Sequence, residues 1–187
     1  EVRGEIERRF DALLAPLVRE LRLACLMVQY APWFTATRGN VRRLETLRKH
    51  WPDLPISVEF RHKSWLSAER RERVFDLLRA ERFSYVCVDE PDVAGGGVPP
   101  LVTVTNPELS LVRFHGHNLA GWTKKGASVH ERFDYLYGTG ELSAWLEPVT
   151  RLSGESREVH AIFNNCVRNY AVIDAKGLAA LLEGDGH

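Results

Sequence analysis

The sequence predicts one α/β domain with a parallel sheet, built as part of a (β/α) barrel of the TIM-barrel type. Two observations lead to this fold class. Short apolar runs, typical of buried parallel strands, alternate with stretches whose apolar residues recur at helical spacing. This strand–helix unit recurs about every 30 residues without a linker-like segment, which indicates a single domain over residues 1–187.

Each predicted strand is a short apolar run bounded by polar or turn-forming residues. The five runs are residues 23–29, 55–61, 84–89, 111–116 and 158–164. Because the strands are joined through helices, and such crossovers are right-handed with short connections, we expect a parallel sheet in chain order.

Each predicted helix carries apolar residues three and four positions apart. The helices are expected at residues 3–21, 40–50, 66–81, 139–152 and about 169–183. The expected buried stripes of the first and last helices are Ile6, Phe10, Leu13, Leu14, Leu17 and Leu21, and Val172, Ala175, Leu178, Leu181 and Leu182. Ser64 or Ser67 is expected to cap the third helix and Thr139 the fourth.

Two glycine-rich segments are predicted to lack strands. Residues 90–100 hold three consecutive glycines and three prolines, which is typical of a surface loop. The long connection at 117–138 contains Gly121, Gly126 and Gly138. A full eight-unit barrel needs about 250 residues. The five units predicted here are therefore roughly three short, and either N-terminal units are absent or the sheet is open.

The composition limits the classes of function. Lysine plus arginine and aspartate plus glutamate number 25 each, so the net charge of zero argues against broad nonspecific nucleic-acid binding. No apolar run approaches the roughly 18 residues of a membrane span, and no signal peptide opens the chain. Cys25, Cys87 and Cys166 form no CxxC pair. We expect a cytoplasmic protein without a membrane partner and with reduced cysteines.

Polar side chains gather where the predicted strands end, which is the edge that carries chemistry in parallel βα folds. The strands end in Gln29, in Glu59 to His62, in Asp89 and Glu90, in Arg113 to His117, and in Asn164 and Asn165. Side chains two positions apart share a strand face, so Glu59 and Arg61 should point together, as should Arg113 and His115. We expect Glu59, Arg61, Arg113, His115 and Asn164 to converge.

These residue types predict an anion site. Arginine forks suit phosphate or carboxylate, and Glu59 or His115 is the expected catalytic acid or base. The expected substrate-binding residues are Arg61, Trp65, Arg113, Asn164 and Asn165. A structural ion-pair network is the alternative for the charged residues, and strand-end hydrogen bonding is the alternative for the asparagines. No cofactor is assigned, and a divalent metal on His115 and His117 is the less favoured interpretation.

Aromatic residues also follow the strand ends. Trp65, Trp122, Tyr135 and Tyr137 are candidates to stack on a base or a sugar. Trp145 has helical spacing with Leu142 and Val149 and is expected in the core.

Four segments resemble the YecE-like proteins, a family defined by domain of unknown function 72. They are LAPLVRELRLACLMVQYAP at 14–32, VEFRHKSW at 58–65, VRFHGHN at 112–118 and FNNCVRNYAVIDAKGLAALL at 163–182. The sequence departs from the family pattern at Asp174, where asparagine is usual, and at Gln29 to Pro32. The resemblance implies a (β/α) barrel, of which this chain is the C-terminal part, lacking a glycine–tryptophan strand and two further βα units.

The resemblance implies no reaction, since the family has none established. Fold-level analogy points to barrels of the xylose isomerase and apurinic endonuclease group, whose metal ligands would correspond here only to Glu59, Asp89, His115 and His117. The leading hypothesis is a hydrolase or isomerase acting on a small phosphate or sugar-phosphate substrate. A nucleic-acid-binding or nucleic-acid-processing protein and a noncatalytic partner protein are the alternatives. Self-association through the first and last strands is expected if the barrel is incomplete.

Overall fold

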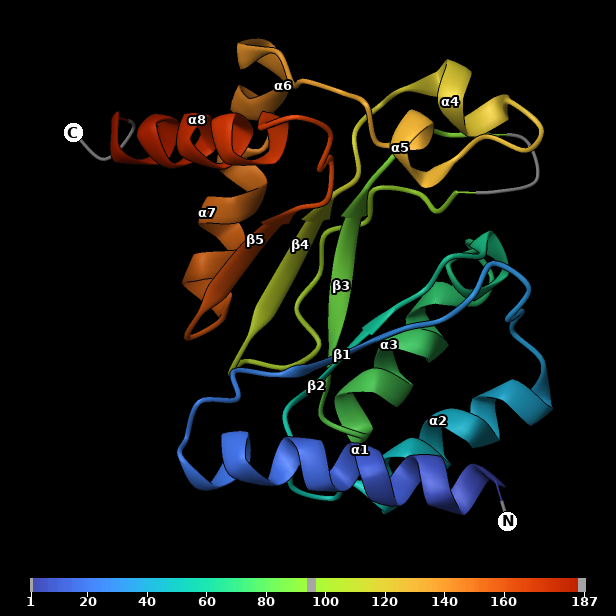
Figure 1. Cartoon of the computed structure of the whole chain (residues 1–187). Helices are drawn as coiled ribbons and strands as arrows, with labels where there is room; N and C mark the ends of the chain where they lie inside the picture. The colour runs from blue at the N-terminus through green and yellow to red at the C-terminus, as the bar shows by residue number, and fades with distance from the viewer. Residues whose placement is uncertain (1, 94–96, 185–187) are drawn as a thin grey trace.

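A computed structural model describes residues 2–93 and 97–184 of the chain. Its centre is a curled, parallel half-barrel sheet of five strands (Figure 1). The strands are β1 (Leu26–Gln29), β2 (Ile56–Glu59), β3 (Phe83–Asp89), β4 (Ser110–Phe114) and β5 (Val159–Phe163). Their order in the sheet is their order in the chain, and every pairing is parallel, so the predicted α/β topology is confirmed.

Burial along the sheet follows the position of each strand. All residues of β2, β3 and β4 are buried, because neighbouring strands and packed side chains cover both of their faces. Residues of β1 and β5 are half-buried or exposed, and these two strands form the edges of the described sheet. The sheet is therefore open, as one of the two sequence-based alternatives proposed.

The helices of the first half are α1 (Val2–Arg19), α2 (Arg38–His50) and α3 (Arg71–Ala80), with a single 3₁₀ turn, η1 (Lys63–Trp65), before α3. The predicted start of the third helix at residue 66 is wrong, because η1 and a turn occupy residues 63–70. His62 caps η1 by accepting a hydrogen bond from Ser64 N. Ser64 Oγ instead accepts from Ala36 N, and α3 has no side-chain cap.

The second half contains α4 (Leu119–Thr123), α5 (Val129–Arg132), α6 (Thr139–Ser143), α7 (Leu146–Glu155) and α8 (Tyr170–Gly184). The single helix expected at 139–152 is two helices, because Pro148 lacks the N–H that would continue α6 into α7. Gly138, rather than Thr139, occupies the cap position of α6. Residues 94–96 of the predicted 90–100 loop lie outside the described residues.

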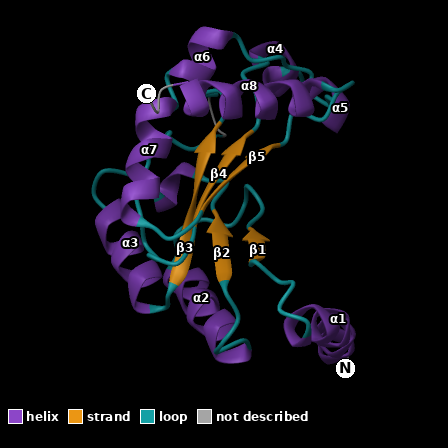
Figure 2. Cartoon of the chain, turned by 90° about the vertical axis from the view of Figure 1, so that its left-hand side faces the viewer, coloured by secondary structure: helices purple, strands orange, loops and turns teal. Residues whose placement is uncertain are grey.

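The core lies between the sheet and the helices that run along one of its faces, α2, α3 and α7 (Figure 2). Trp145, Val149 and Leu152 are buried there as expected. Cys87 is buried, Cys25 is half-buried and Cys166 is exposed.

Two predicted helix stripes are only partly buried. Helix α1 buries Leu14, but Leu13 and Leu21 are 65% and 93% exposed. These α1 side chains are exposed because α1 passes below the starts of the strands and does not run along a face of the sheet (Figure 1). Its Asp11 accepts a hydrogen bond from the Trp51 indole there. In α8, Leu178 is buried but Val172 is exposed. No helix among the described residues has the length and apolarity needed to cross a membrane.

Candidate active site at the strand ends

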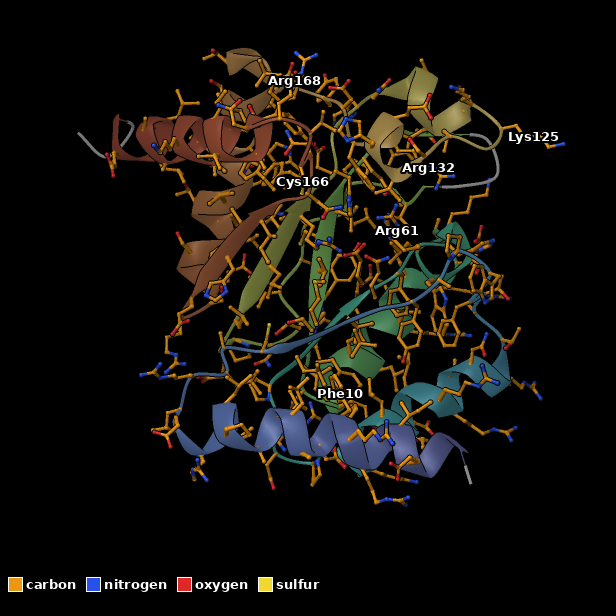
Figure 3. All side chains as sticks on the ribbon, in the orientation of Figure 1. Phe10, Arg61, Lys125, Arg132, Cys166 and Arg168 are labelled. Carbon is orange, nitrogen blue, oxygen red and sulfur yellow. The ribbon has the colours of Figure 1, made fainter. Side chains whose placement is uncertain are left out.

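Five polar side chains from three strands or their extensions meet at the carboxyl ends of the sheet. Glu59 is the last residue of β2 and Arg113 lies near the end of β4, while Arg61, His115 and Asn164 follow the ends of β2, β4 and β5. Figure 3 shows Arg61 at this edge of the sheet. The strand register explains the convergence, because Gln29 pairs with Glu59 and Ile162 pairs with Arg113, which places alternate residues on one face.

Glu59 is the centre of this cluster and is completely buried. Its Oε1 accepts a hydrogen bond from Arg61 Nη1 at 3.0 Å, and its Oε2 accepts from Arg113 Nη1 at 2.5 Å. The His115 Nε2 atom lies 3.2 Å from Oε1. Arg113 Nη1 also donates to Gln29 Oε1 at 2.8 Å, which joins β1 to the cluster. The expected convergence of Glu59, Arg61, Arg113 and His115 is confirmed.

Glu59 is ionised in this setting. Burial alone would raise the pKa of its carboxyl group, but the His115 hydrogen bond and the charges of Arg113 and Arg61 oppose this effect, and the pKa is lowered to about 2. The Glu59 carboxylate therefore forms an ion pair with both guanidinium groups.

His115 is held between groups that fix its ring. Its Nε2 lies 2.7 Å from Arg61 Nη1, and its Nδ1 lies 3.1 Å from Asn164 Nδ2. A guanidinium only donates, so Nε2 accepts from Arg61 in one neutral tautomer and donates to Glu59 in the other. Burial lowers the pKa of His115, although the Glu59 hydrogen bond opposes this effect. The imidazole is therefore neutral at pH 7 and can accept a proton.

Glu90 adds a second carboxyl group to the arginines. Its Oε2 lies 2.8 Å from Arg61 Nη2, and its Oε1 accepts a hydrogen bond from Val98 N at 2.8 Å. Burial raises the pKa of Glu90 to about 7, with Arg61 opposing the rise. The two guanidinium groups therefore face two buried carboxyl groups, of which Glu59 has the lowered pKa and Glu90 the raised pKa.

A second polar group lies on the other side of the β3 and β4 ends. Asp89 Oδ2 accepts hydrogen bonds from the Tyr137 hydroxyl at 2.6 Å and from His117 Nε2 at 2.9 Å. The Tyr137 oxygen in turn accepts from Gly116 N at 2.9 Å. The hydrogen bond to Asp89 raises the pKa of His117. His115 and His117 therefore have different partners, and the backbone turns between them at Gly116, whose φ is +82°.

The paired metal site considered for these two histidines is not formed. His115 faces Glu59 and Asn164, whereas His117 faces Asp89. Within residues 2–93 and 97–184, no three His, Cys, Asp or Glu side chains are grouped in a way that could hold a metal ion.

Trp65 and Asn165 lie outside the cluster, and their predicted substrate-binding role stays a prediction. The Trp65 ring is completely buried, stacks between Phe34 and Phe60, and donates its indole N–H to Phe34 O at 2.6 Å. Asn165 is completely buried and donates to Tyr135 O and to Asp174 Oδ2. Both side chains therefore stabilise the fold on the helix side of the sheet.

Gln29 and Glu90 are parts of the site to which the sequence assigned no role, and Trp122 was expected to stack on a base or a sugar but not to contact Arg61. Gln29 and Glu90 end their strands on the same face as Glu59, so the alternation rule could have added both. The Arg61 guanidinium lies over the Trp122 ring, with its Cζ atom 5.2 Å from the centre of that ring. That contact joins α4 to the end of β2, and no local pattern in the sequence indicates it.

Comparison with known proteins gives consistent matches over the chain. A family model described as "Protein of unknown function DUF72" matches residues 2–187. The UPF0759 protein YunF of Bacillus subtilis (strain 168) is 33% identical over 192 residues, which cover 97% of this chain and 68% of YunF.

Two solved structures of DUF72 family proteins show the same arrangement. The protein from Enterococcus faecalis V583 superimposes with a TM-score of 0.91 at 35% identity, covering 96% of this chain and 66% of that one. The protein from Thermotoga maritima MSB8 gives a TM-score of 0.85 at 35% identity, covering 96% and 65%. The chain thus spans about two thirds of the length of these relatives.

Proposed function

This chain belongs to the DUF72 family of proteins of unknown function, and from that premise we propose that its strand-end cluster is an enzyme active site for a small phosphate or sugar-phosphate substrate. The observation that carries the proposal is geometric: two arginines meet at one strand-end edge, and the buried Nε of Arg113 has no hydrogen-bond partner among the described residues. Arg61 and Arg113 share the ionised Glu59, and Arg61 also contacts Glu90, whose pKa is raised by burial. Guanidinium groups suit a phosphate, whose oxygens accept their N–H donors.

The arginines retain donors for such a ligand. Arg113 uses Nη1 for both Glu59 and Gln29, and its buried Nε has no hydrogen-bond partner among the described residues. A buried donor without a partner costs stability, so its presence at this edge supports a ligand-binding role. Arg61 and Arg113 would bind the anion through their free guanidinium nitrogens.

His115 is the general base of this proposal. It is neutral near pH 7, and Asn164 and Arg61 fix its ring. In a hydrolysis it would take a proton from the attacking water, and in an isomerisation it would take one from the substrate. Glu59 would then stabilise the imidazolium that forms, through the 3.2 Å contact to Nε2.

Ligand binding to Arg113→Lys tests the proposal. Inorganic phosphate, glucose 6-phosphate and glucose serve as probes in calorimetry and thermal shift. Glucose 6-phosphate should bind at least ~10-fold more tightly to the wild-type protein than to Arg113→Lys, because lysine cannot make the forked contact. Arg79→Lys, an exposed arginine paired with Asp76, is the matched control and should bind normally. Equal binding by Arg113→Lys, or binding of glucose alone, would show that the cluster is only structural.

Nucleic-acid binding is the second candidate, supported by Trp122 beside Arg61. The buried Trp65 no longer supports it. A salt series with a single-stranded oligonucleotide distinguishes the two functions. Contacts to several phosphates give a steep fall of affinity with salt, whereas one small phosphate ester gives a shallow fall.

A further inference from the structure

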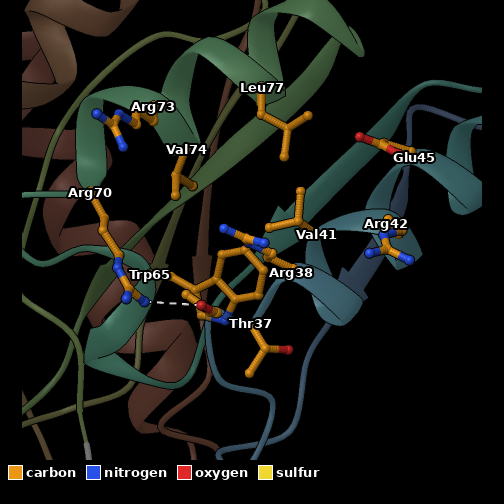
Figure 4. Close-up of a pocket in the computed structure, with 11 residues that line it drawn as sticks. Thr37, Arg38, Val41, Arg42, Glu45, Trp65, Arg70, Arg73, Val74 and Leu77 are labelled. Carbon is orange, nitrogen blue, oxygen red and sulfur yellow. Dashed lines mark hydrogen bonds between the residues drawn. The ribbon is translucent and has the colours of Figure 1, made fainter.

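A groove between α2 and α3 lies on the helix side of the sheet, away from the strand-end cluster (Figure 4). Its volume is about 540 Å³. Val41, Val74 and Leu77 form an apolar floor, and four arginines surround it, namely Arg38, Arg42, Arg70 and Arg73. The two sites lie on opposite faces of the sheet. Phe60 packs on Trp65, which lines the groove, whereas Glu59, the residue before Phe60, belongs to the strand-end cluster.

Helical spacing explains why these residues gather. In α2, Arg38, Val41 and Arg42 occupy positions i, i+3 and i+4 and therefore share a face. Just before and within α3, Arg70, Arg73 and Val74 have the same spacing. The two helices thus present matching faces, each with arginines beside an apolar side chain.

The arginines around the groove are largely without partners. The side chains of Arg38, Arg42 and Arg73 are exposed and form no hydrogen bond or ion pair among the described residues. Arg70 Nη1 donates to Ala36 O at 2.9 Å, as the dashed line in Figure 4 marks. Glu45 is the one acidic residue that lines the groove among the described part of the chain. The lining therefore carries a positive charge that the fold does not neutralise.

The start of α2 adds to this positive potential. A helix begins with unpaired N–H groups and the positive end of its dipole, which favours acidic residues in the first turn. The first turn of α2 has no acidic residue and begins with Arg38. Arg42 follows four positions later, where like charges repel. The helix therefore leaves this positive potential without an acidic side chain of its own first turn to offset it.

We propose that the groove binds a phosphorylated small molecule with a planar apolar body, the chemistry of a nucleoside monophosphate. The volume suits a small ligand, since such pockets measure about 300–1,000 Å³. The phosphate lies between Arg38, Arg70 and Arg73 at the helix starts. The planar ring lies on Val41, Val74 and Leu77, with the Arg42 guanidinium able to stack on its face.

Calorimetry with AMP, adenosine and inorganic phosphate tests this site. AMP should bind at least ~10-fold more tightly than either fragment, because only AMP reaches both the arginines and the apolar floor. Arg38→Gln combined with Arg73→Gln should weaken AMP binding at least ~10-fold. Arg43→Gln is the matched control, since Arg43 lies on α2 but lines a different surface. All of these side chains are exposed, so melting temperatures should be unchanged.

A second variant separates this site from the strand-end cluster. Arg113→Lys alters the cluster and should leave AMP affinity unchanged, whatever the outcome of the glucose 6-phosphate experiment. Loss of AMP binding in Arg113→Lys but not in the double variant would place AMP at the strand ends and overturn the groove site. Absence of AMP binding to the wild-type protein would also overturn the groove site. The proposal would equally fail if the protein bound a single-stranded oligonucleotide or an acidic peptide through Arg38 and Arg73 but did not bind AMP.

Discussion

Replacing Glu59 with glutamine should destabilise the fold by roughly 3 kcal/mol near pH 7. The change removes the charge that holds Arg61 and Arg113, and the new amide N–H₂ faces one of these guanidinium donors. The ionised Glu59 has a pKa of about 2 against a usual 4.5, and each pKa unit corresponds to about 1.36 kcal/mol. Removing one partner of a buried ion pair independently costs about 3–5 kcal/mol.

The loss should depend on pH in a defined direction. The folded-state pKa of Glu59 is lower than its unfolded value, so its contribution is present above about pH 4.5 and is lost as the pH falls towards about 2. The stability gap between wild type and Glu59→Gln should therefore be full near pH 7 and should narrow near pH 3. For a chain of this size, roughly 3 kcal/mol corresponds to a melting-temperature decrease of roughly 6–12 °C.

Urea unfolding followed by far-UV circular dichroism measures the gap at several pH values. Glu20→Gln is the control, because Glu20 is exposed and its pair with Arg19 should contribute less than about 1 kcal/mol. If Glu59→Gln is as stable as the wild type near pH 7, or if the gap is the same near pH 3, the arginines do not depend on an ionised Glu59.

Three further substitutions test neighbouring features by the same unfolding assay. Burial raises the pKa of Glu90 to about 7, so the stability of the wild-type protein should fall as the pH rises from about 4.5 through about 7. Glu90→Gln should make this fall in stability shallower. An unchanged pH profile of stability in Glu90→Gln would contradict the raised pKa. Tyr137→Phe removes a hydroxyl that joins Asp89 to Gly116 N and should lower the stability by about 1–3 kcal/mol. The Tyr135 hydroxyl donates to the exposed Glu141, so Tyr135→Phe should lower the stability by less than about 1 kcal/mol. Equal losses in the two variants would count against the buried link. Gly116→Ala and Gly126→Ala both place alanine at positive φ, but only at Gly116 would the new Cβ lie 2.6 Å from Tyr135 Cβ. Gly116→Ala should therefore lower the stability by at least about 1 kcal/mol more than Gly126→Ala. Equal losses of stability in the two variants would exclude the clash.

The sheet and the centre of the cluster were predictable because one rule governs both. Parallel strands are apolar on both faces, so they appear as short apolar runs, and their polar residues stand at the ends. Alternation then places Glu59 with Arg61 and Arg113 with His115, as the structure shows. The same rule separates Asn164 from Asn165, which point to opposite faces, and applying it there would have excluded Asn165.

The features that the sequence did not reveal depend on distant packing. Trp65 follows a polar strand end, but its ring is enclosed by Phe34, which lies about thirty positions earlier. The α1 stripe has the period of a buried helix, yet α1 passes below the sheet and leaves Leu13 exposed. Period alone reports that a helix has an apolar face, and it does not report which surface that face meets.

The distance along the chain between Glu59 and its partners bears on how the protein folds during synthesis. Arg61 is two residues away, but Arg113 and His115 are 54 and 56 residues further along. When β3 has left the ribosome but β4 has not, the Glu59 carboxylate lacks the β4 partners that surround it in the folded chain. A charge in that position favours hydration over burial. The segment that precedes β4 should therefore stay loosely packed at this edge until β4 has been translated.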